Sequence, residues 1–315
     1  MTHATGSPRR CVITGGAGFI GSHVVDAYLA AGHEVAVLDN LASGKRENLG
    51  PVARFYEVDL RAASAVEAVV AEFRPQVINH HAAQASVAVS VQKPGFDAEN
   101  NVLGMINLLE AARAHGVQRV LYSSTGGALY GETDRIPTPE DHPTRPLSPY
   151  GCAKLCGEEY LATWHRLHGL EYLIFRYGNV YGPRQSPHGE AGVVAIFAGL
   201  MREGRPPTIF GPGGKTRDYV YVGEVARASL LALDCAPGAT VNIATGRQTT
   251  DRQVFEAVAA AVGYAGPPLY GPERAGDLQH SCLDITHARR LLGWEPQIEF
   301  AEGVRRTVAH LSGEG

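Results

Sequence analysis

The chain of 315 residues is poor in cysteine and has no long apolar run. Its cysteines are odd in number, scattered and without a C-x-x-C pair: Cys11, Cys152, Cys156, Cys235 and Cys282. Free thiols in a reducing compartment are therefore expected rather than disulfides or a metal site. The polar N-terminal stretch of residues 1–10 is not followed by an apolar segment that could serve as a signal peptide or membrane span. We expect a cytoplasmic protein with no membrane partner.

An excess of charge of one sign is also lacking. The formal net charge is −4, from 28 basic and 32 acidic residues, and no basic block occurs. Nucleic-acid-binding surfaces need clustered cations, so the sequence gives no support to a nucleic-acid partner. His165 and His168 could suggest a metal pair, but nothing nearby supplies further ligands. No metal is expected.

What the sequence contains is an alternation of apolar runs and helical patterns, which favours a parallel sheet covered on both faces. Ser148 is a predicted N-cap with Pro149 at the first helical position, so that a helix begins at Tyr150 and runs to about His168. We expect an α/β fold, a Rossmann doubly wound parallel sheet with a smaller C-terminal α/β substrate lobe. Strands are expected near residues 11–13, 35–38, 55–58, 77–79, 120–122 and 172–175, and further helices over 62–73 and 96–115.

The first apolar run ends in a cluster of glycines. Gly16, Gly18 and Gly21 fit G-x-G-x-x-G, and Gly15 adds the G-x-x-G-x-x-G spacing. Glycines at such a strand-to-helix turn permit a tight turn and let backbone N–H groups approach a pyrophosphate. The second apolar run ends in Asp39, whose carboxylate could take the adenosine ribose hydroxyls. An acid at this place favours NAD over NADP.

The expected domains follow from this placement. The NAD-binding domain is expected to span residues 8–178, with a return of the chain to it at about 219–246. Residues 179–218 and 247–315 are expected to form the smaller, substrate-binding lobe. The turn-rich segments near Gly182 and Gly211 mark that smaller lobe.

Tyr150 and Lys154 stand four apart in the first turn and a half of the helix after Pro149, a spacing that places both on one face. A tyrosine with an ordinary pKa near 10 is a poor base at neutral pH. A neighbouring ammonium and a positive nicotinamide would favour the phenolate and lower that pKa. Tyr-x-x-x-Lys is a short motif, but it follows the glycine turn, Asp39 and the polar strand end Ser124–Thr125 in order. Together they indicate an NAD-dependent redox site.

With these motifs the chain resembles the extended short-chain dehydrogenase/reductases, and within them the bacterial UDP-glucose (UDP-galactose) 4-epimerases. The resemblance covers almost the whole length. Its further motifs are Leu38-Asp39-Asn40, Asp59-Leu60, residues 80–84, Asn100-Asn101-Val102, residues 123–131, residues 176–184, residues 217–220 and residues 274–278. It implies an isomerase that inverts C4 of a UDP-hexose through a 4-keto sugar, with NAD as a regenerated cofactor.

The resemblance also implies roles for single residues. Tyr150 would be the base on the sugar 4-hydroxyl, Lys154 would hold the nicotinamide ribose, and Thr125, or its neighbour Ser124, would share the proton's hydrogen bond. The implied NAD-binding residues are Gly15, Gly18, Phe19, Ile20, Gly21, Asp39, Asn40, Ser43, Gly44, Asp59, Leu60, His81, Ala82, Ala83, Gln84, Asn100, Ser123, Tyr150, Lys154 and Tyr177. The implied substrate-binding residues are Thr125, Tyr150, Asn179, Gly192, Val193, Thr208, Phe210, Arg217, Arg274 and Asp277.

Alternatives remain open. Related dehydratases carry Asp-Glu after the catalytic threonine, whereas Gly126-Gly127 follow Thr125 here, which argues against elimination of water. A UDP-glucuronate 4-epimerase, with Arg184 meeting the carboxylate, or another nucleotide-sugar-modifying member is the nearest rival. A non-catalytic NAD-binding protein would not need Thr125, Tyr150 and Lys154 together.

Two further expectations come from the resemblance. Ser281 stands where some members carry a tyrosine beside the sugar 2-substituent, so the pocket is expected to admit UDP-GlcNAc and UDP-GalNAc as well. A homodimer is expected through the helices near residues 102–110 and 154–167.

Overall fold

The computed structural model describes residues 7–187, 192–274 and 277–313. Its centre is a sheet of seven parallel strands in the order β11-β6-β5-β4-β1-β2-β3. The doubly wound fold predicted from the sequence is thereby confirmed. The strands are β1 (Arg10–Thr14), β2 (Glu34–Asp39), β3 (Arg54–Glu57), β4 (Val77–His80), β5 (Arg119–Thr125), β6 (Glu171–Tyr177) and β11 (Ala239–Ile243).

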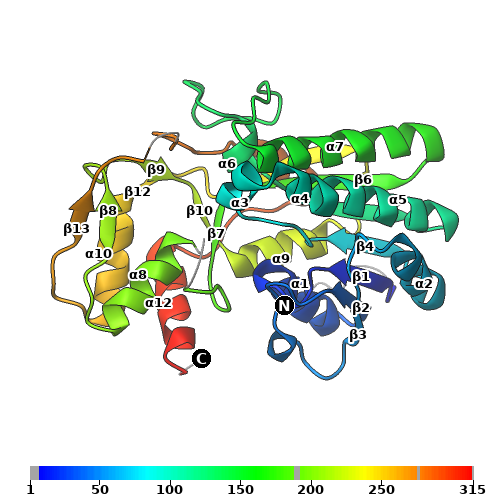
Figure 1. Ribbon diagram of the computed structural model, residues 1–315, viewed down its shortest axis with the longest axis horizontal. Helices are drawn as coiled ribbons and strands as arrows, with labels where there is room; N and C mark the ends of the chain where they lie inside the picture. The colour runs from blue at the N-terminus through cyan, green and yellow to red at the C-terminus, as the bar shows by residue number, and fades with distance from the viewer. Residues whose placement is uncertain (1–6, 188–191, 275–276, 314–315) are drawn as a thin grey trace.

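Helices cover both faces of this sheet (Figure 1). One layer consists of α1 (Phe19–Ala30), α9 (Val222–Leu231) and α11 (Thr286–Leu292), whose apolar residues form one core with the sheet. The other layer consists of α2 (Ala63–Phe73), α5 (Gly104–Ala114) and α7 (Pro149–His168), which bury a second core. Strands buried on both faces explain the unbroken apolar runs in the sequence.

The helix expected over residues 96–115 is divided. It consists of α4 (Pro94–Ala98), a π-helical turn η2 (Glu99–Leu103) and α5, preceded by α3 (Val87–Gln92). Helix α7 begins and ends as expected, because the Ser148 side chain accepts a hydrogen bond from Gly151 N and Gly169 ends the helix in the left-handed conformation. Two short elements complete this half: η1 (Arg46–Asn48) and α6 (Gly126–Leu129).

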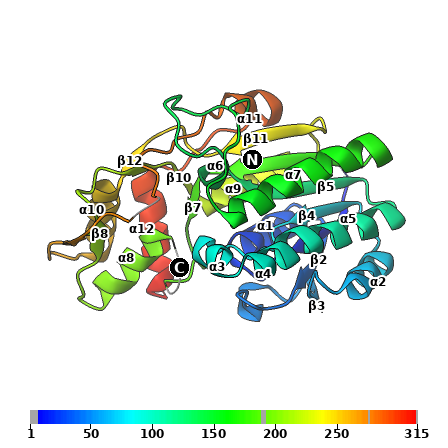
Figure 2. The ribbon, with the colours of Figure 1, turned by 45° about the horizontal axis from the view of Figure 1, so that its top comes forward.

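A smaller lobe lies beside the carboxyl ends of the strands (Figures 1 and 2). Its helices α8, α10 and α12 enclose a third apolar core. Residues 283–294 belong to the part of the chain expected in this lobe. They instead pack in the core that the main sheet forms with α1 and α9. The elements of the lobe and its junction are β7 (Asn179–Tyr181), α8 (Val193–Arg202), β8 (Thr208–Phe210), β9 (Thr216–Arg217), β10 (Tyr219–Tyr221), β12 (Thr249–Thr250), α10 (Asp251–Val262), β13 (Leu269–Gly271) and α12 (Phe300–Leu311).

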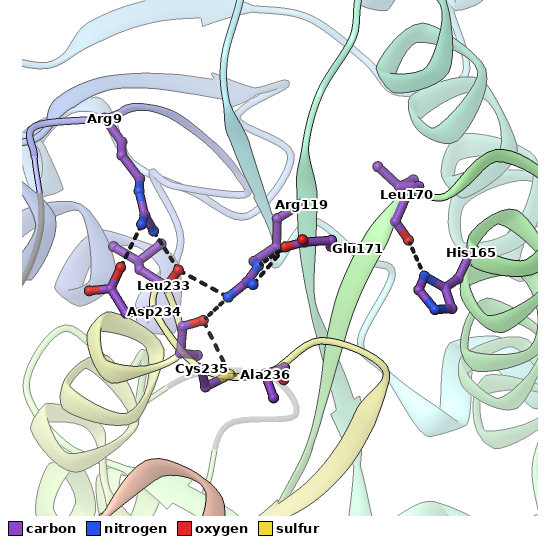
Figure 3. Close-up of polar contacts among 10 residues, drawn as sticks. Arg9, Arg119, His165, Leu170, Glu171, Leu233, Asp234, Cys235 and Ala236 are labelled. Atoms are coloured by element: carbon purple, nitrogen blue, oxygen red, sulfur yellow. Dashed lines mark hydrogen bonds and ion pairs between the residues drawn. The ribbon is translucent and has the colours of Figure 1, made fainter.

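The amino ends of the strands are tied together by arginines (Figure 3). Arg119 donates to Ala232 O at 2.8 Å and Leu233 O at 2.9 Å, the carbonyls that follow α9, and ion-pairs with Glu171. Arg9 pairs with Asp234 beside it. Cations at the carboxyl end of a helix satisfy its last carbonyls and its dipole. These contacts fix the end of the sheet that lies opposite the smaller lobe.

A buried carboxylate joins the two lobes at Asp218, between β9 and β10. Its Oδ1 accepts hydrogen bonds from the backbone N and hydroxyl of Thr245, and its Oδ2 accepts from Gly246 N at 2.9 Å and Leu283 N at 3.2 Å. The side chain is 1% exposed. Three separate segments therefore meet at one carboxylate next to Arg217.

Replacing Asp218 by asparagine is expected to lower the free energy of unfolding by about 3 kcal/mol, because the amide cannot accept from all these buried donors. Chemical denaturation measures the change. Asp141→Asn, which removes an exposed ion pair with Arg135, is the control and should change the same quantity by no more than about 1 kcal/mol. Equal effects of the two substitutions would contradict the role given to Asp218.

Candidate active site

The glycine turn between β1 and α1 brings backbone segments too close for side chains. Gly15 has a positive φ of 66°, and a Cβ there would lie 2.6 Å from Ala82 N. A Cβ on Gly21 would lie 2.2 Å from Gly15 O. Helix α1 has no side-chain cap and no acidic residue in its first turn. Its first N–H groups and its dipole can therefore receive an anion such as a pyrophosphate.

Asp39 is the last residue of β2, the strand that pairs with β1, as expected. Its carboxylate is buried and accepts hydrogen bonds from Ala17 N at 3.0 Å and Leu41 N at 2.8 Å. A Cβ on Gly44 would lie 3.0 Å from Asp39 Oδ1, so Gly44 packs behind the carboxylate. These contacts hold an anionic oxygen pair at the wall of a cavity, where ribose hydroxyls could donate to it.

That cavity, of about 640 Å³, runs from the glycine turn to α7. Every residue expected to bind the cofactor lies in its lining except Gly44. Those in the lining are Gly15, Gly18, Phe19, Ile20, Gly21, Asp39, Asn40, Ser43, Asp59, Leu60, His81, Ala82, Ala83, Gln84, Asn100, Ser123, Tyr150, Lys154 and Tyr177.

A second cavity, of about 590 Å³, adjoins the first and shares Tyr150, Tyr177 and Ser124 with it. Five of the residues expected to hold the substrate lie in its lining: Thr125, Tyr150, Asn179, Arg217 and Asp277. The other five, Gly192, Val193, Thr208, Phe210 and Arg274, do not line it. The Arg274 guanidinium lies over the Phe210 ring, 3.7 Å from its centroid. Ala275 and Gly276 of the same motif lie outside the described residues.

Tyr150 therefore stands where the two cavities meet. Lys154, one turn further along α7, is 4% exposed and donates from Nζ to Ser123 O at 2.8 Å. Its Nζ lies 5.9 Å from the centroid of the Tyr150 ring and 5.0 Å from that of Tyr122. The spacing of four residues has placed the phenol and the ammonium on one face, as expected.

The electrostatics of this pair differ from the expectation. Burial raises the pKa of Tyr150 to about 12, and the Asp97 carboxylate acts in the same direction. Burial also lowers the pKa of Lys154 to about 8, against the opposing effects of Asp97 and Glu158. The chain by itself thus keeps Tyr150 a phenol. Charge brought into the cavity is needed to favour the phenolate.

The hydroxyls of Ser124 and Thr125, at the end of β5 beside Tyr150, make different hydrogen bonds. Thr125 Oγ1 accepts from Ala128 N at 3.3 Å, which leaves its proton available toward the second cavity. Ser124 Oγ donates to Glu158 at 2.5 Å, so its proton is already engaged. This arrangement fits Thr125, rather than Ser124, as the hydroxyl that shares the proton's hydrogen bond.

The neighbouring histidines are structural groups that shape the cavity. His80 Nδ1 lies 2.7 Å from Thr14 Oγ1, and its ring stacks on Tyr122. His81 Nδ1 lies 2.7 Å from Ser123 Oγ. Burial lowers the pKa of His81 to about 3, so the imidazole that lines the first cavity is neutral.

Several site residues were missed by the sequence reasoning. Phe96 lines the first cavity from α4, and Asp97 and Glu158 set the charge near Lys154. Lys215 is buried and pairs with Asp277 at 3.2 Å. Glu158 follows Lys154 by four residues and Tyr150 by eight, so the three side chains share one face of α7. Of the missed residues, only Glu158 could have been found from such a spacing in the sequence.

Arg184 was expected to meet a uronate carboxylate, and Ser281 to leave room for an N-acetyl group. Both lie outside the two cavities. Arg184 pairs with Asp26 of α1 at 2.7 Å and lines neither cavity. Ser281 donates from its backbone N to Thr216 O at 3.2 Å and also lines neither.

Three other expectations concern absent features. Within residues 7–187, 192–274 and 277–313 no three His, Cys, Asp or Glu side chains gather as metal ligands. No helix in those residues is long and apolar enough to cross a membrane. All five cysteines are free thiols.

The comparisons with known proteins agree with this geometry. Residues 11–244 match the model of the NAD dependent epimerase/dehydratase family. The UDP-glucose 4-epimerase of Mycolicibacterium smegmatis is 47% identical over 95% of this chain and 97% of its own. The structure of UDP-glucose 4-epimerase from Thermotoga maritima with UDP-glucose superposes with a TM-score of 0.95, at 48% identity, over 96% of this chain and 99% of that one.

A second solved structure, the UDP-glucose 4-epimerase of Thermus thermophilus in complex with NAD, gives a TM-score of 0.92 at 50% identity. It covers 97% of this chain and 100% of that one. The glycine turn, Asp39 and the Tyr150–Lys154 pair all lie within the stretch that the family model matches. The chain therefore belongs to the NAD dependent epimerase/dehydratase family.

Proposed function

We propose that the protein is an NAD-dependent UDP-glucose 4-epimerase, an isomerase that interconverts UDP-glucose and UDP-galactose through a 4-keto sugar. The observation that carries this proposal is the position of Tyr150 at the junction of the two cavities, beside the Lys154 ammonium. One phenol can then reach both a nicotinamide on one side and a hexose on the other.

The residues of the first cavity suit NAD. The open N-terminus of α1 would hold the pyrophosphate, Asp39 the adenosine ribose and Lys154 the nicotinamide ribose. When bound, NAD⁺ supplies the hydride acceptor and a cationic ring next to Tyr150. Tyr150 would take the proton of the 4-hydroxyl and later return it, while Thr125 hydrogen-bonds to the same oxygen.

The second cavity suits a UDP-sugar. The Arg217 guanidinium is held by hydrogen bonds to Thr216 O and Leu278 O, both at 2.8 Å, and can pair with a diphosphate. Asp277, oriented by Lys215, would accept hydrogen bonds from ribose hydroxyls. A substrate tethered at its nucleotide leaves the hexose free to present either face of C4.

A uronate substrate is the weaker candidate. The cation expected to meet its carboxylate, Arg184, is paired with Asp26 and lines neither cavity. A panel of UDP-glucose, UDP-galactose and UDP-glucuronate with NAD⁺, followed by NMR, separates the possibilities. Conversion of UDP-glucuronate alone would establish the rival activity, and conversion of none would favour a non-catalytic NAD-binding protein.

Tyr150→Phe is expected to lower kcat for UDP-galactose by roughly 10²–10⁴-fold, because the proton acceptor is lost. Bound NAD, measured after extraction of the cofactor, should change little. Tyr160→Phe on the same helix is the control and should keep wild-type kcat. A Tyr150→Phe enzyme with unchanged kcat would remove Tyr150 from the mechanism.

We also propose that substrate breadth extends to the N-acetylhexosamines. Ser281 itself lines neither cavity, but its backbone N donates to Thr216 O next to Arg217 of the second cavity, so a large side chain at position 281 could reach that cavity. Ser281→Tyr should lower kcat/KM for UDP-GlcNAc by roughly tenfold or more and leave that for UDP-glucose within a few-fold. Ser312→Tyr, after α12, controls for the added ring. Identical kinetics of wild type and Ser281→Tyr with both sugars would refute the role of position 281.

We also propose a cytoplasmic homodimer. Apolar side chains are exposed on α3, α4 and η2, and α7 carries two exposed cysteines. Helices α3 and α4 lie next to α7 (Figure 2). An exposed apolar surface of this kind is typical of an interface, and a helix face suits a second copy of the chain. Leu103 and Leu167 lie in the two helices expected to pair, near 102–110 and 154–167, and Val87, Val91 and Phe96 extend the exposed apolar surface to α3 and α4. Free cysteines suit a reducing compartment.

The double substitution Val91→Glu and Leu103→Glu is expected to convert the dimer to monomer, since these side chains are 61% and 53% exposed within one chain. Introduced carboxylates would have to be buried without partners on association. Light scattering after size exclusion measures the mass. Val52→Glu, at a site 76% exposed and remote from these helices, should leave the mass unchanged. A monomeric wild type would contradict the proposal.

A further inference from the structure

Glu158 is a buried carboxylate on the catalytic face of α7. It follows Tyr150 by eight residues and Lys154 by four, so the three side chains lie along one face of the helix. Only 5% of Glu158 is exposed, and it lines neither cavity. A glutamate is almost never buried in this way without paired charge.

The carboxylate bridges two neighbouring strands at the level of the active site. Glu158 Oε1 accepts from Ser124 Oγ at 2.5 Å and from Arg176 Nε at 3.0 Å, and Oε2 accepts from Arg176 Nη2 at 2.6 Å. Ser124 on β5 and Arg176 on β6 are partners in the register of the sheet. The strand end that carries Thr125 is therefore fastened to the helix that carries Tyr150.

The arginine is itself fixed on its other side. Arg176 Nη1 donates to the Tyr130 hydroxyl at 2.9 Å and to Glu140 O at 3.1 Å. Tyr130 in turn donates to Asn242 of β11 at 3.0 Å. Every polar atom of the Glu158 carboxylate and its partner has a defined geometry, which is the condition for a rigid buried network.

We propose that Glu158 is a positioning residue for the epimerase reaction: it holds Ser124, and with it Thr125, against α7 and provides a fixed negative charge one turn from Lys154. The proposal rests on the proposed function. A buried ion pair gives little net stability over apolar packing, so its place one turn from Lys154 is better explained by a role in the site than by stability.

The charges that face Lys154 are few and can be named. Asp97 approaches from α4 and Glu158 from its own helix, and both favour the ammonium. His80 at the end of β4 and His81 directly after it are kept neutral by burial. The Tyr122 ring on β5 and the Tyr150 ring also lie near the ammonium. Removing the Glu158 charge leaves Asp97 as the remaining carboxylate and leaves Arg176 unpaired, and both consequences disfavour protonated Lys154.

The test is Glu158→Gln, which keeps the shape and removes the charge. The alkaline limb of kcat for UDP-galactose is expected to move to lower pH by roughly one pH unit, because the Lys154 ammonium is lost earlier. Ser124→Ala removes the hydrogen bond and no charge, so kcat should fall by roughly tenfold with KM and the alkaline limb unchanged. Glu158→Asp should restore the limb. Glu159→Gln, exposed on the same helix, is the matched control and should behave as wild type.

A second readout does not depend on the activity. The titration of Lys154 Nζ, followed by NMR in ¹⁵N-lysine-labelled protein, should move to lower pH in Glu158→Gln and not in Ser124→Ala or Glu159→Gln. If the titration moves and no UDP-sugar is converted, the proposed function fails and the role of Glu158 in setting the Lys154 charge stands. Unchanged titration and pH profile in Glu158→Gln overturn the inference. Should Glu158→Gln not fold, wild-type kcat in Ser124→Ala would overturn it as well.

Discussion

The close seating of α7 on the carboxyl end of β5 is the contact on which both cavities depend. A Cβ on Gly157 would lie 2.3 Å from the Tyr122 hydroxyl, and one on Gly151 would lie 2.7 Å from Ala128 O. The helix can lie this near to β5 and to the following α6 only because these two positions carry no side chain. Lys154 can then reach Ser123 O with its ammonium. Tyr150 is thereby fixed at the boundary between the cofactor side and the substrate side.

The last three residues of β5 direct their side chains to different places. Ser123 lines the first cavity and Thr125 the second, while Ser124 turns its hydroxyl to Glu158 on the helix. Three consecutive residues thus face the first cavity, the Glu158 carboxylate and the second cavity, with Ser124 also in the lining of both cavities. This division is possible because the strand ends in the crevice where an open α/β sheet places its ligands.

The features that the sequence predicts well are local ones. The glycine turn, the acid that ends β2, the Ser148–Pro149 helix start and the Tyr150–Lys154 spacing each depend on a few neighbouring residues, and the structure has them where expected. Pairing across long distances is different. The contact of Lys215 with Asp277 joins residues 62 apart, and Arg184 turns to Asp26 of α1. Neither pairing can be predicted from the sequence, because it depends on how distant segments are arranged in the fold.

The burial of titratable side chains is the second property that the sequence does not predict. The motif predicts that a neighbouring ammonium and a bound, positive nicotinamide together lower the pKa of the tyrosine. In the chain alone both side chains are enclosed, and burial moves both pKa values toward the neutral forms. The helix expected over 96–115 likewise hides a π-helical turn, beside which Asp97 is buried against Gln84 and Asn101. The sequence pattern of apolar residues does not record where such a carboxylate faces.

The charges around Lys154 explain why the phenol stays protonated in the chain by itself. Lys154 and Arg176 are balanced by Asp97 and Glu158, so the buried group is close to neutral as a whole. A phenolate at Tyr150 would add one unbalanced negative charge to an enclosed region, which is strongly unfavourable. A positive charge in the first cavity, which Tyr150 lines, would restore the balance. If Tyr150 is the base of the proposed reaction, an oxidised, cationic nicotinamide would favour its phenolate, and a reduced, uncharged one would favour the phenol. Return of the proton to the sugar would then be coupled to the return of the hydride, which restores the positive charge.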